Sequence, residues 1–461
     1  MSPSLFYKDV AVSSPARHSL HSLLQMTTNA SPYAAFIGID RSDRNIDATI
    51  LHPNGDQAAY QRVSTKPSSL RDWLYQVRDD FSNGPLAICI EQPCANLTAF
   101  LSQFDFVVLF LINPATLKRW REAFQVSKAK DDRNDSKHLA QLVHERHAKL
   151  QAWCPQDADT RMLRRLCESR RHLVNRRTQL TNQLKAILKD YFPLALEITG
   201  REIHTRLACR FLTKWPSLER LQRAEPERIR SFYYLHGSRR PKVIDQRLAD
   251  IAEAVPLTED PAIVKPAIMM VKAIVKQLDA LRQHIDQFEA AIDKLYHSHK
   301  DAAIFESLPG AGSVLGSRLL VSFGSDRDRY ENASAVQKFC GIAPVTKQSG
   351  RTRVVSRRLA SPHFERQTFI EWVGQTVIKS VWAKAFYQRM KDKGMGHWSA
   401  LRSLAYRWIR VIYRCWKDRQ PYDEERYIKC LTATGSPLAP IIRELQSSAN
   451  NPTNNSQEFT C

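Results

Sequence analysis

Four carboxylates are the side chains of this chain whose types and spacing best fit a reaction centre. Asp40 and Glu91 each end an apolar run, and Asp132 and Asp135 lie three residues apart before a helical-looking stretch. Residues three apart on a helix share one face, so the two aspartates would point the same way. Carboxylate oxygens that converge on one point bind Mg²⁺ and suit phosphoryl transfer assisted by two metal ions. We therefore predict that these four residues are catalytic and hold Mg²⁺, with two ions as the expected number.

An ordinary structural role is also open to each carboxylate. A single Asp or Glu at a strand end is usually a solvated cap, and the aspartates of KAKDDRNDSK can cap the helix that follows. That role explains one aspartate and not the set of four. Asp131 competes with Asp132 as a ligand, and the spacing to Asp135 favours Asp132. The neighbouring cations Lys130 and Arg133 are predicted to screen the cluster or to bind a phosphate of a nucleic acid.

The elements that must position the first two carboxylates read as alternating strands and helices. Strands are predicted over 34–40, 45–52, 57–64, 86–91 and 106–112, and helices over 68–81, 96–103 and from Pro114 onward. The order β-β-β-α-β-α-β-α is that of the ribonuclease-H-like α/β fold. That fold has acidic residues at the ends of its first and fourth strands, which are the positions of Asp40 and Glu91.

A strong excess of positive charge accompanies the acidic cluster. The 461 residues include 68 Lys and Arg against 47 Asp and Glu, which gives a formal net charge of +21 and a pI near 9.7. That balance indicates a polyanionic partner, and beside a carboxylate cluster it favours nucleic acid. With 43% hydrophobic residues, the chain has the composition of an ordinary globular protein of about two to four domains.

Cysteine usage and hydropathy predict the compartment. The nine cysteines include no Cys-x-x-Cys pair, so we expect reduced thiols and no zinc site. The longest apolar run, 106–112, is far shorter than a membrane span. Residues 1–30 lack a cationic start followed by an apolar block, so no secretory signal is expected. These features predict a cytoplasmic protein without a membrane partner.

Changes of composition along the chain predict five segments. They are a flexible extension over 1–31, an α/β catalytic domain over 32–158, a helical coiled-coil region over 159–300, a small helical domain over 301–420 and a flexible tail over 421–461. The helical region contains one long helix from 161 to Pro193 and another over 266–297. Apolar residues of the second helix repeat at nearly heptad spacing, which fits a helical hairpin within one chain as well as a coiled coil between chains.

The helix from 161 also carries an unusual charge pattern. It has six arginines with almost no acidic residue to balance them, namely Arg164, Arg165, Arg170, Arg171, Arg176 and Arg177. A solvated face is the usual fate of such a run. The imbalance favours contact with nucleic acid instead.

The small helical domain opens with SLPGAGSVLGSRLLVSFG, which reads as helix, glycine turn and helix. This stretch resembles a helix-hairpin-helix, whose turn offers backbone N–H groups to a phosphate. Two further helices are predicted over 363–391 and 398–417. The second interleaves aromatic residues with arginines: Trp398, Tyr406, Trp408, Tyr413 and Trp416 with Arg402, Arg407, Arg410 and Arg414. Aromatic residues at this spacing form either a core or a base-stacking surface.

A second candidate for chemistry is the polar loop around Ser349. By itself a serine beside a glycine is an ordinary loop residue. Its neighbours Lys347, Arg351 and Arg353 are cations that would stabilise a pentavalent phosphate and a nearby alkoxide. We expect these three cations to bind nucleic acid, whereas residue types alone do not make Ser349 a nucleophile.

Several stretches of the chain resemble one known family, the DEDD insertion-sequence transposases, now described as bridge-RNA-guided serine recombinases. FIGID with Asp40 and AICIE with Glu91 are similar to the first two acidic stations. INPATLKRWREAFQVSKAKDDRND is similar to an Asn-Pro stretch that leads to a Lys-x-Asp-Arg-x-Asp motif. SLPGAGSVLGSRLL, CGIAPVTKQSGRTR and AFYQRMKDKG resemble the C-terminal transposase domain. The similarity spans about residues 34–417.

The resemblance implies a RuvC-like N-terminal domain that binds Mg²⁺, a coiled-coil middle and a C-terminal transposase domain. By motif position it implies that Ser349 attacks double-stranded DNA and forms a covalent phosphoserine link. It also implies a homo-oligomer, a dimer or a tetramer, in which the acidic site of one protomer pairs with the serine of another. A noncoding RNA from the element would pair with donor and target DNA, while the protein holds the backbone. This places the protein in the bacterial cytoplasm or nucleoid.

The chain departs from the family pattern at two places. Gln92 and Pro93 follow the second acidic station, where the family has a Thr-Gly-like pair. Arg351-Thr352-Arg353 follows Gly350 in a loop that is often glycine-rich, so Ser356 remains an alternative to Ser349. Two rival functions also remain: a metal-dependent endonuclease of the Holliday-junction-resolvase type that uses water, and a degenerate protein that only binds nucleic acid.

Overall fold

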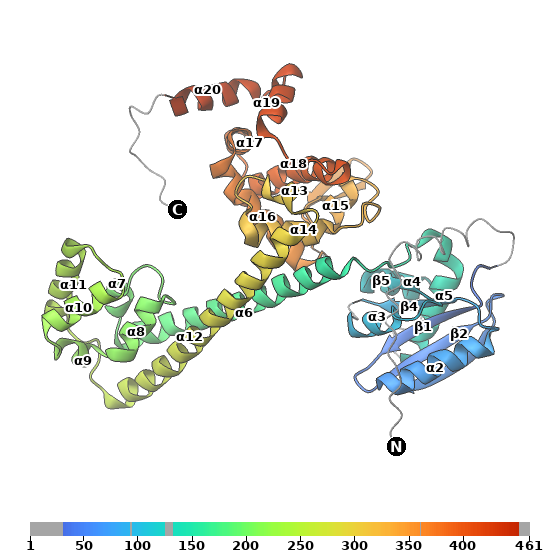
Figure 1. Ribbon diagram of the computed structural model, residues 1–461, viewed down its shortest axis with the longest axis horizontal. Coiled ribbons are helices and arrows are strands. Elements are labelled where there is room, and N and C mark those ends of the chain that lie inside the picture. The colour runs from blue at the N-terminus through green and yellow to red at the C-terminus, as the bar shows by residue number, and fades with distance from the viewer. Residues whose placement is uncertain (1–30, 93–94, 125–131, 360, 451–461) are drawn as a thin grey trace. The chain divides into compact units, whose positions relative to one another are not determined.

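The computed structural model describes residues 31–92, 95–124, 132–359 and 361–450 (Figure 1). The predicted flexible extension therefore lies almost wholly outside the described residues. The chain divides into two compact units, which meet in sequence at Asp157 and Ala158. Each unit has its own core and is described by itself. None of the helices among the described residues is long and apolar enough to cross a membrane.

Unit 1 is built on a five-stranded mixed sheet of order β3-β2-β1-β4-β5. Its strands are β1 (Ala35–Arg41), β2 (Asn45–Leu51), β3 (Gln57–Ser64), β4 (Leu86–Glu91) and β5 (Val107–Ile112). The first three strands pair antiparallel, and β1, β4 and β5 pair parallel. The predicted α/β domain with these five strands is thus confirmed at the level of its elements.

Alternation along the strands divides the core into two layers. Ile37, Ile39 and Ile90 belong to the apolar cluster that also contains α2 (Pro67–Asp80) and α3 (Ala95–Leu101). Since successive side chains of a strand point to opposite faces, the intervening residues face the other side. Residues of that side, Phe36 and Cys89 among them, pack with α4 (Pro114–Phe124) and α5 (Asp132–Arg146), which is followed by the short helix η1 (His147–Lys149).

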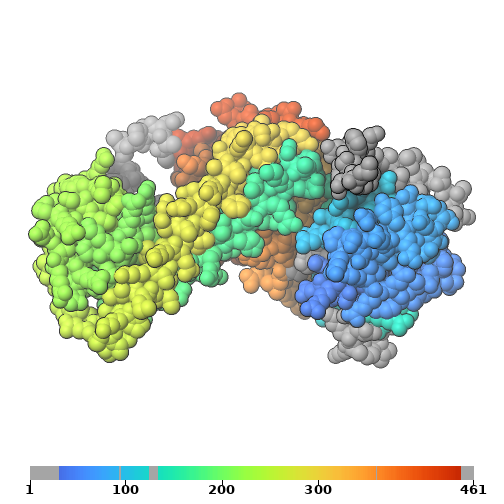
Figure 2. Space-filling view, turned by 60° about the horizontal axis from the view of Figure 1, so that its bottom comes forward, coloured from blue at the N-terminus to red at the C-terminus, as the bar shows by residue number. Residues whose placement is uncertain are grey.

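Unit 2 begins with two long helices, α6 (Ala158–Tyr191) and α12 (Pro261–Ser298), which lie side by side (Figures 1 and 2). At their far end a lobe of short helices packs on them. Its helices are α7 (Ala195–Ile198), α8 (Arg206–Lys214), α9 (Leu218–Gln222), α10 (Pro226–Leu235) and α11 (Pro241–Glu253). Val271, Val275 and Leu278 of α12 are buried against this chain's own residues. The near-heptad pattern therefore reports a helical hairpin within one chain.

The second long helix begins earlier than the sequence predicted. Pro261 occupies its first turn and Asp260 caps it, accepting a hydrogen bond from the Ala262 backbone N–H at 2.8 Å. Pro266, the predicted start, lies inside the helix. Proline fits the first turn of a helix, so Pro261 and Pro266 are equally good start signals in the sequence. The cap provided by Asp260 favours the start at Pro261.

The remainder of unit 2 is a helical domain with one small hairpin. Its elements are α13 (Ala302–Glu306), α14 (Gly312–Phe323), α15 (Ala333–Phe339), β6 (Val345–Ser349), β7 (Thr352–Ser356), α16 (His363–Lys379), α17 (Val381–Asp392), α18 (His397–Asp418), α19 (Glu424–Ala433) and α20 (Ala439–Asn450). Trp372, Trp382, Trp408 and Trp416 are fully buried in its core. Most of the tryptophans of this domain therefore serve packing.

One predicted helix is two helices in the structure. The stretch expected as one helix over 363–391 breaks at Ser380, between α16 and α17. Ser380 has extended backbone angles, and its side chain accepts a hydrogen bond from the Ala383 backbone N–H. Its hydroxyl also donates to Glu424 at 2.9 Å. An N-cap serine inside an otherwise helical pattern is the signal that was missed.

The predicted flexible tail over 421–461 is wrong for residues 424–450. Asp423 caps α19 by accepting a hydrogen bond from the Arg426 backbone N–H at 3.0 Å, and α20 follows. Leu438 and Ile442 are 1% exposed and belong to the domain core. The Ser, Thr, Asn and Pro content that predicted disorder is concentrated beyond these helices, and residues 451–461 lie outside the described residues.

Candidate active site

Asp40 and Glu91 lie side by side at one edge of the sheet. In the parallel pairing of β1 with β4, Ile39 is the Cα partner of Ile90, and each carboxylate follows its isoleucine directly. Adjacent strands are about 4.8 Å apart. Alternation places both carboxylates on the face covered by α5. The pairing brings together two residues that are 51 positions apart in the sequence, as the strand order predicted.

Gly38 allows α5 to lie directly on β1. A Cβ atom at this position would come within 2.0 Å of the Ser136 backbone oxygen and 2.2 Å of the Ala140 backbone nitrogen. No other residue type leaves that space without moving the helix. The hydroxyls of Thr49 in β2 and Ser136 in α5 are hydrogen-bonded at 2.8 Å in the core. These contacts hold the start of α5 against β1 and β2, next to Asp40.

The start of α5 carries the other two predicted carboxylates. Asp135 is 4% exposed, and its Oδ1 accepts a hydrogen bond from Arg121 Nη1 of α4 at 2.6 Å. Asp132 is the first residue of α5, and its side chain lies outside the described residues, as does all of Lys130. The Asp-x-x-Asp spacing is therefore helical, and Asp135 is held by a cation that the sequence had not singled out.

A neighbouring histidine adds no positive charge near neutral pH. His138 follows Asp135 by one helical turn and is 7% exposed. Burial lowers the pKa of His138, and the Asp135 carboxylate opposes that shift. Arg121 is thus the cation that compensates Asp135 in the described surroundings.

The donor set of this edge fits a hard cation such as Mg²⁺, because carboxylate oxygens are the ligands that this ion takes in proteins. In the described part of the chain, no group of three or more Asp, Glu, His or Cys side chains is placed to hold a metal ion. The side chain of Asp132 lies outside that part of the chain. The structure thus aligns Asp40 with Glu91 and presents the α5 backbone to them, while convergence of all four carboxylates stays a prediction.

Asp47 is a fifth carboxylate that the sequence analysis did not single out. It is the cross-strand partner of Asp40 on β2 and is only 3% exposed. The Tyr60 hydroxyl donates to Asp47 Oδ1 at 2.5 Å, and this hydrogen bond raises the pKa of Tyr60. The guanidinium of Arg133 lies over the Tyr60 ring, 4.8 Å from its centroid. A lone aspartate in the apolar strand NIDATIL was the available signal.

This arrangement gives Arg133 a structural partner beside the site. Its guanidinium lies on the Tyr60 ring, a cation–π contact that fixes the side chain next to the first turn of α5. An arginine can keep such a contact and still direct N–H donors to a phosphate. The predicted role of Arg133 in binding nucleic acid is therefore compatible with its place and stays a prediction.

Ser349 lies at the tip of the β6–β7 hairpin in unit 2. It is the Cα partner of Thr352, and Gly350 and Arg351 form the connecting turn. Gly350 has a φ of +54°. A two-residue hairpin turn favours glycine at its first central position because of that positive φ. Ser349 is thus the last residue of β6, and Gly350 begins the turn of an exposed hairpin.

The predicted cations are distributed over both faces of this hairpin. Lys347 shares the face of Ser349 because it lies two residues earlier on the same strand. Arg353 is paired with Gln348 on the opposite face. Ser356 is paired with Val345 at the base of the hairpin. Val345 precedes Ser349 by four residues on β6, so Ser356 lies roughly 13 Å from Ser349 along the strand direction. All residues from 346 to 357 are exposed.

Three of the six arginines singled out on α6 are engaged within unit 2. Arg164 Nη1 donates to Glu365 at 2.7 Å, Arg171 Nη2 donates to Glu371 at 3.1 Å, and Arg170 pairs with Glu289. The predicted nucleic-acid contact is therefore wrong for Arg164, Arg170 and Arg171, whose guanidinium groups are used in packing. Glu168, a second partner of Arg164 at 3.3 Å, is four residues away on α6. Glu289, Glu365 and Glu371 lie more than a hundred residues away, so the sequence could not show those three pairings.

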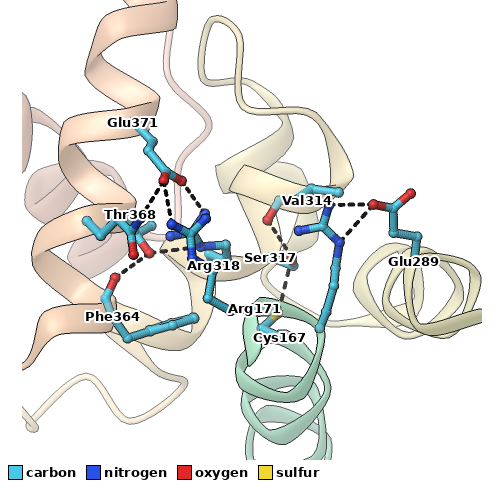
Figure 3. Close-up of polar contacts among 11 residues, drawn as sticks. Cys167, Arg171, Glu289, Val314, Ser317, Arg318, Phe364, Thr368 and Glu371 are labelled. Atoms are coloured by element: carbon cyan, nitrogen blue, oxygen red, sulfur yellow. Dashed lines mark hydrogen bonds and ion pairs between the residues drawn. The ribbon is translucent and has the colours of Figure 1, made fainter. Parts of the chain in front are cut away.

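The glycine turn before α14 leads into a buried helix. All residues from 316 to 323 are buried, including Arg318 at 3% exposure. Its Nε donates to Thr368 at 3.0 Å and its Nη1 to Glu371 at 2.6 Å. Figure 3 shows Arg318 and Arg171 approaching the same Glu371 carboxylate from different helices. The second helix of the predicted helix-hairpin-helix thus serves the core of this domain.

Two family models match the chain. One, described as a transposase, matches residues 37–193. The other, described as the transposase family of IS116, IS110 and IS902, matches residues 302–388. The first match covers the sheet, α5 and all four predicted carboxylates. The second covers α14 and the hairpin that carries Ser349.

Curated relatives match most of the chain. It is 28% identical over 400 residues to a mini-circle protein of Streptomyces coelicolor named as a transposase for IS117, covering 85% of this chain and 96% of the relative. It is 23% identical over 400 residues to the uncharacterized 42 kDa protein of insertion element IS900 from Mycobacterium paratuberculosis, covering 84% and 96% respectively. A protein of insertion element IS116 from Streptomyces clavuligerus is 26% identical over 310 residues. On its two model matches and these relatives, the chain belongs to the DEDD insertion-sequence transposase family.

Proposed function

We propose that this transposase excises and inserts its own insertion element by a serine recombinase mechanism. The observation that carries the proposal is the alignment of Asp40 and Glu91 on the sheet face covered by α5. That edge offers carboxylates to a metal ion, and the exposed hairpin of unit 2 offers a hydroxyl beside cations. The two features lie within the two segments that the transposase models match.

The proposed reaction exchanges one phosphodiester for another. The Ser349 hydroxyl loses its proton as its oxygen bonds to phosphorus, and the bond from phosphorus to a deoxyribose oxygen breaks. That oxygen takes a proton and leaves as a hydroxyl. In the second stage a deoxyribose hydroxyl of the new strand attacks the phosphoserine and releases the serine. Bond energy is retained in the phosphoserine ester, so strand joining needs no external energy source.

The site residues have distinct roles in this scheme. Asp40, Glu91, Asp132 and Asp135 would hold Mg²⁺, which when bound supplies charge stabilisation to the phosphate and to the attacking and leaving oxygens. Lys347, Arg351 and Arg353 would orient the phosphate at the hairpin. The structure places Lys347 on the face of Ser349, and we assign it the contact nearest the reacting phosphate.

We propose that the active complex is a homo-oligomer guided by a noncoding RNA of the element. In this arrangement the carboxylates of one protomer act with Ser349 of another. An isolated two-stranded hairpin is marginally stable in water. The exposure of residues 346–357 on both faces therefore supports a hairpin that orders on a partner surface. Base pairing by the RNA would select DNA sequences while basic residues hold the backbone.

The rival reaction is hydrolysis by the same carboxylates. The carboxylates and Ser349 belong to different units, so unit 1 could activate water without the hairpin. A recombination assay with the full chain, Mg²⁺, the element's flanking RNA and a plasmid that bears the element separates the two. Ser349→Ala should abolish both excision and cleavage, and Ser356→Ala should retain both. Cleavage that survives Ser349→Ala would favour the hydrolytic nuclease.

The third reading is a degenerate protein that binds nucleic acid without reaction. The same assay with Asp40→Asn tests it, because a metal-dependent reaction depends on that carboxylate. We expect excision to fall by on the order of 10²-fold or more, the range seen when one electrostatic stabiliser of a transition state is removed. Equal activity of the wild type and Asp40→Asn would remove the carboxylates from the mechanism.

A further inference from the structure

Helix α18 has an outward face that packing of the core does not explain. Its inward residues Leu404, Trp408 and Ile412 are fully buried. On the outward side, Trp398 is 63% exposed and Tyr406 is 38% exposed. Exposed apolar area is unfavourable in water, and a group of such rings on one face is typical of an interaction site.

Aromatic and basic residues alternate along this face. They are Trp398, Arg402, Tyr406, Arg410 and Arg414. The interval of four residues makes each one a neighbour of the next on the helix surface. Trp398 and Arg410 are separated by roughly 18 Å along the axis, from twelve residues at about 1.5 Å each. No acidic residue occurs between positions 397 and 417, and Asp418 at the end of the helix pairs with Arg414, so α18 supplies no carboxylate to Arg402 or Arg410.

Two basic residues of α18 are already occupied. Arg407 donates from Nε to the Tyr427 hydroxyl at 3.0 Å, and its guanidinium lies 5.8 Å from the centre of the Trp382 ring. Arg414 pairs with Asp418 in the next turn. These contacts assign Arg407 to packing and weaken Arg414 as a contact for a ligand.

Arg402 and Arg410 keep donors for a ligand. Within the described residues, Arg402 donates to the Ser399 hydroxyl at 2.9 Å and forms no ion pair. Arg410 is exposed and has neither an ion pair nor a side-chain hydrogen bond to another described residue. Both guanidinium groups can therefore direct N–H donors outward, where a phosphate takes two of them at once.

The indole of Trp398 is held in place on one side. The ring of His397 contacts it with centroids 4.9 Å apart and planes at 70°. His397 Nδ1 in turn lies 2.9 Å from the Tyr387 hydroxyl of α17, a hydrogen bond. A ring that is already oriented loses little conformational freedom when a ligand stacks on it. The exposed part of the indole is thus a flat surface that is already oriented for stacking.

A flat aromatic surface between two arginines fits one chemical class of ligand. Nucleobases stack on aromatic rings, and arginines bind the phosphates between them. In a duplex the faces of each base are covered by neighbouring bases, so only an unpaired base can stack on a side chain. We infer that the outward face of α18, made by Trp398, Arg402, Tyr406 and Arg410, binds an unpaired polynucleotide strand. The inference rests on the proposed function, which supplies nucleic acid as the partner.

The test is a binding measurement on the full chain in the absence of divalent metal, so that no cleavage occurs. The probes are a short fluorescein-labelled oligonucleotide of mixed sequence as single-stranded DNA, as single-stranded RNA and as duplex DNA. Trp398→Ala should weaken binding of the single strands by about tenfold and of the duplex by less than about twofold. Trp398→Phe should restore most of the affinity. The single strand with the larger loss identifies the natural source of the unpaired strand.

The arginines are tested with the same probes at several salt concentrations. The double variant Arg402→Gln with Arg410→Gln should weaken binding. It should also make the slope of log affinity against log salt concentration shallower, by the amount expected for the loss of about two phosphate contacts. Tyr234→Ala and Arg228→Gln in α10 are the matched controls, since both residues are exposed on another helix. Both controls should bind all three probes like the wild type.

Three results would overturn the inference. They are unchanged single-strand binding by Trp398→Ala, equal losses for single strands and duplex, and a change in oligomeric state with binding intact, which would make this face a contact between copies. Circular dichroism excludes misfolding of each variant. Failure of the proposed function gives a different result. A protein that binds the single strands through Trp398 and never excises the element would contradict the proposed reaction and leave this binding site in place.

Discussion

Tyr60 connects a buried carboxylate to an arginine beside the first turn of α5. Its hydroxyl donates to Asp47, and Arg133 lies over its ring. Asp47 is paired with Asp40 across two strands, so the position of one carboxylate affects the other. We infer that these contacts fix the orientation of the first turn of α5 relative to Asp40 and Glu91. The role is one of positioning, because none of the three groups need contact the reacting phosphate.

Tyr60→Phe removes one hydroxyl and keeps the ring under Arg133. Asp47 is 3% exposed and loses its closest donor, so we expect a loss of about 1–3 kcal/mol in the free energy of unfolding. Urea unfolding measures it. Tyr75→Phe is the control, because Tyr75 is 45% exposed and its change should leave stability within about 0.5 kcal/mol. Equal stability of wild type and Tyr60→Phe would show that the hydrogen bond from Tyr60 to Asp47 does not stabilise the fold.

The sequence predicted the two carboxylates at the ends of the parallel strands better than it predicted the residues around them. Asp40 and Glu91 stand out because each ends an apolar strand, and the structure aligns those strands in parallel register. Asp47 was missed although it is a lone aspartate in the apolar strand NIDATIL, and Arg121 was missed because nothing local distinguishes it from a solvated residue. Their significance lies in burial and in partners such as Tyr60, and a partner set by sheet pairing cannot be seen from local spacing.

At the scale of elements, the packing of α5 on β1 depends on the absence of a side chain at Gly38. Gly38→Ala would place a Cβ within 2.0 Å of a backbone oxygen that cannot rotate away. We expect a loss of about 3 kcal/mol or more in stability, at the upper end for overpacked cores. Excision should fall as well, because α5 carries two of the predicted ligands.

The control for this substitution is Gly374→Ala in α16. A Cβ there meets nothing within 4 Å, and the residue is inside a helix. Alanine is favoured over glycine in a helix interior by about 1 kcal/mol, so stability should stay equal or rise. Thermal unfolding compares the two variants. A Gly38→Ala protein as stable as Gly374→Ala would show that α5 does not lie on β1 as described.

The carboxylate of Glu371 joins α6, α14 and α16 in unit 2. It accepts hydrogen bonds from Arg318 and Arg171 (Figure 3). Arg318 is 3% exposed, and its removal leaves the buried Thr368 hydroxyl without this donor while Glu371 keeps its ion pair with Arg171, a loss of buried hydrogen bonds that costs about 1–3 kcal/mol. We expect Arg318→Ala to destabilise the protein by about that amount, measured by urea unfolding. Arg165→Ala on the exposed side of α6 should change stability by less than about 0.5 kcal/mol, and a similar loss in both variants would contradict this role.

Local patterns predicted the elements well where the pattern and the tertiary contacts agree. The five strands of unit 1 and the two long helices of unit 2 follow from apolar periodicity. The break at Ser380 and the helices α19 and α20 were missed because composition outweighed capping signals at Ser380 and Asp423. These elements are stabilised by contacts with the domain core, which a local pattern does not contain.

At the scale of the whole molecule, two units with separate cores predict two unfolding events. The apolar clusters of unit 1 share no residue with those of unit 2. Calorimetry of the wild type should therefore resolve two transitions, and Gly38→Ala should lower the midpoint of one of them. A single transition that shifts as a whole would show that the units unfold together.

The reactivity of the cysteine thiols tests whether the same cores are packed as described. Burial raises the pKa of Cys209 and of Cys415 to about 11, so both thiols are protonated at pH 8. Because the thiolate is the reactive form, maleimide labelling of these two should be slow and should rise as the pH approaches 11. Among the described cysteines, Cys430 on α19 is exposed and should label first, as measured by peptide mass spectrometry. Early labelling of Cys209 would contradict the packing of the α7–α11 lobe.

We propose that this transposase forms a phosphoserine link to DNA. The most direct measurement is a denaturing gel of the full chain with Mg²⁺, the element's flanking RNA and labelled junction DNA. We expect a covalent protein–DNA band for the wild type and for Ser356→Ala, and none for Ser349→Ala or Asp132→Ala. Cleaved DNA ends without a covalent band, unchanged in Ser349→Ala, would contradict the serine mechanism and establish a hydrolytic nuclease.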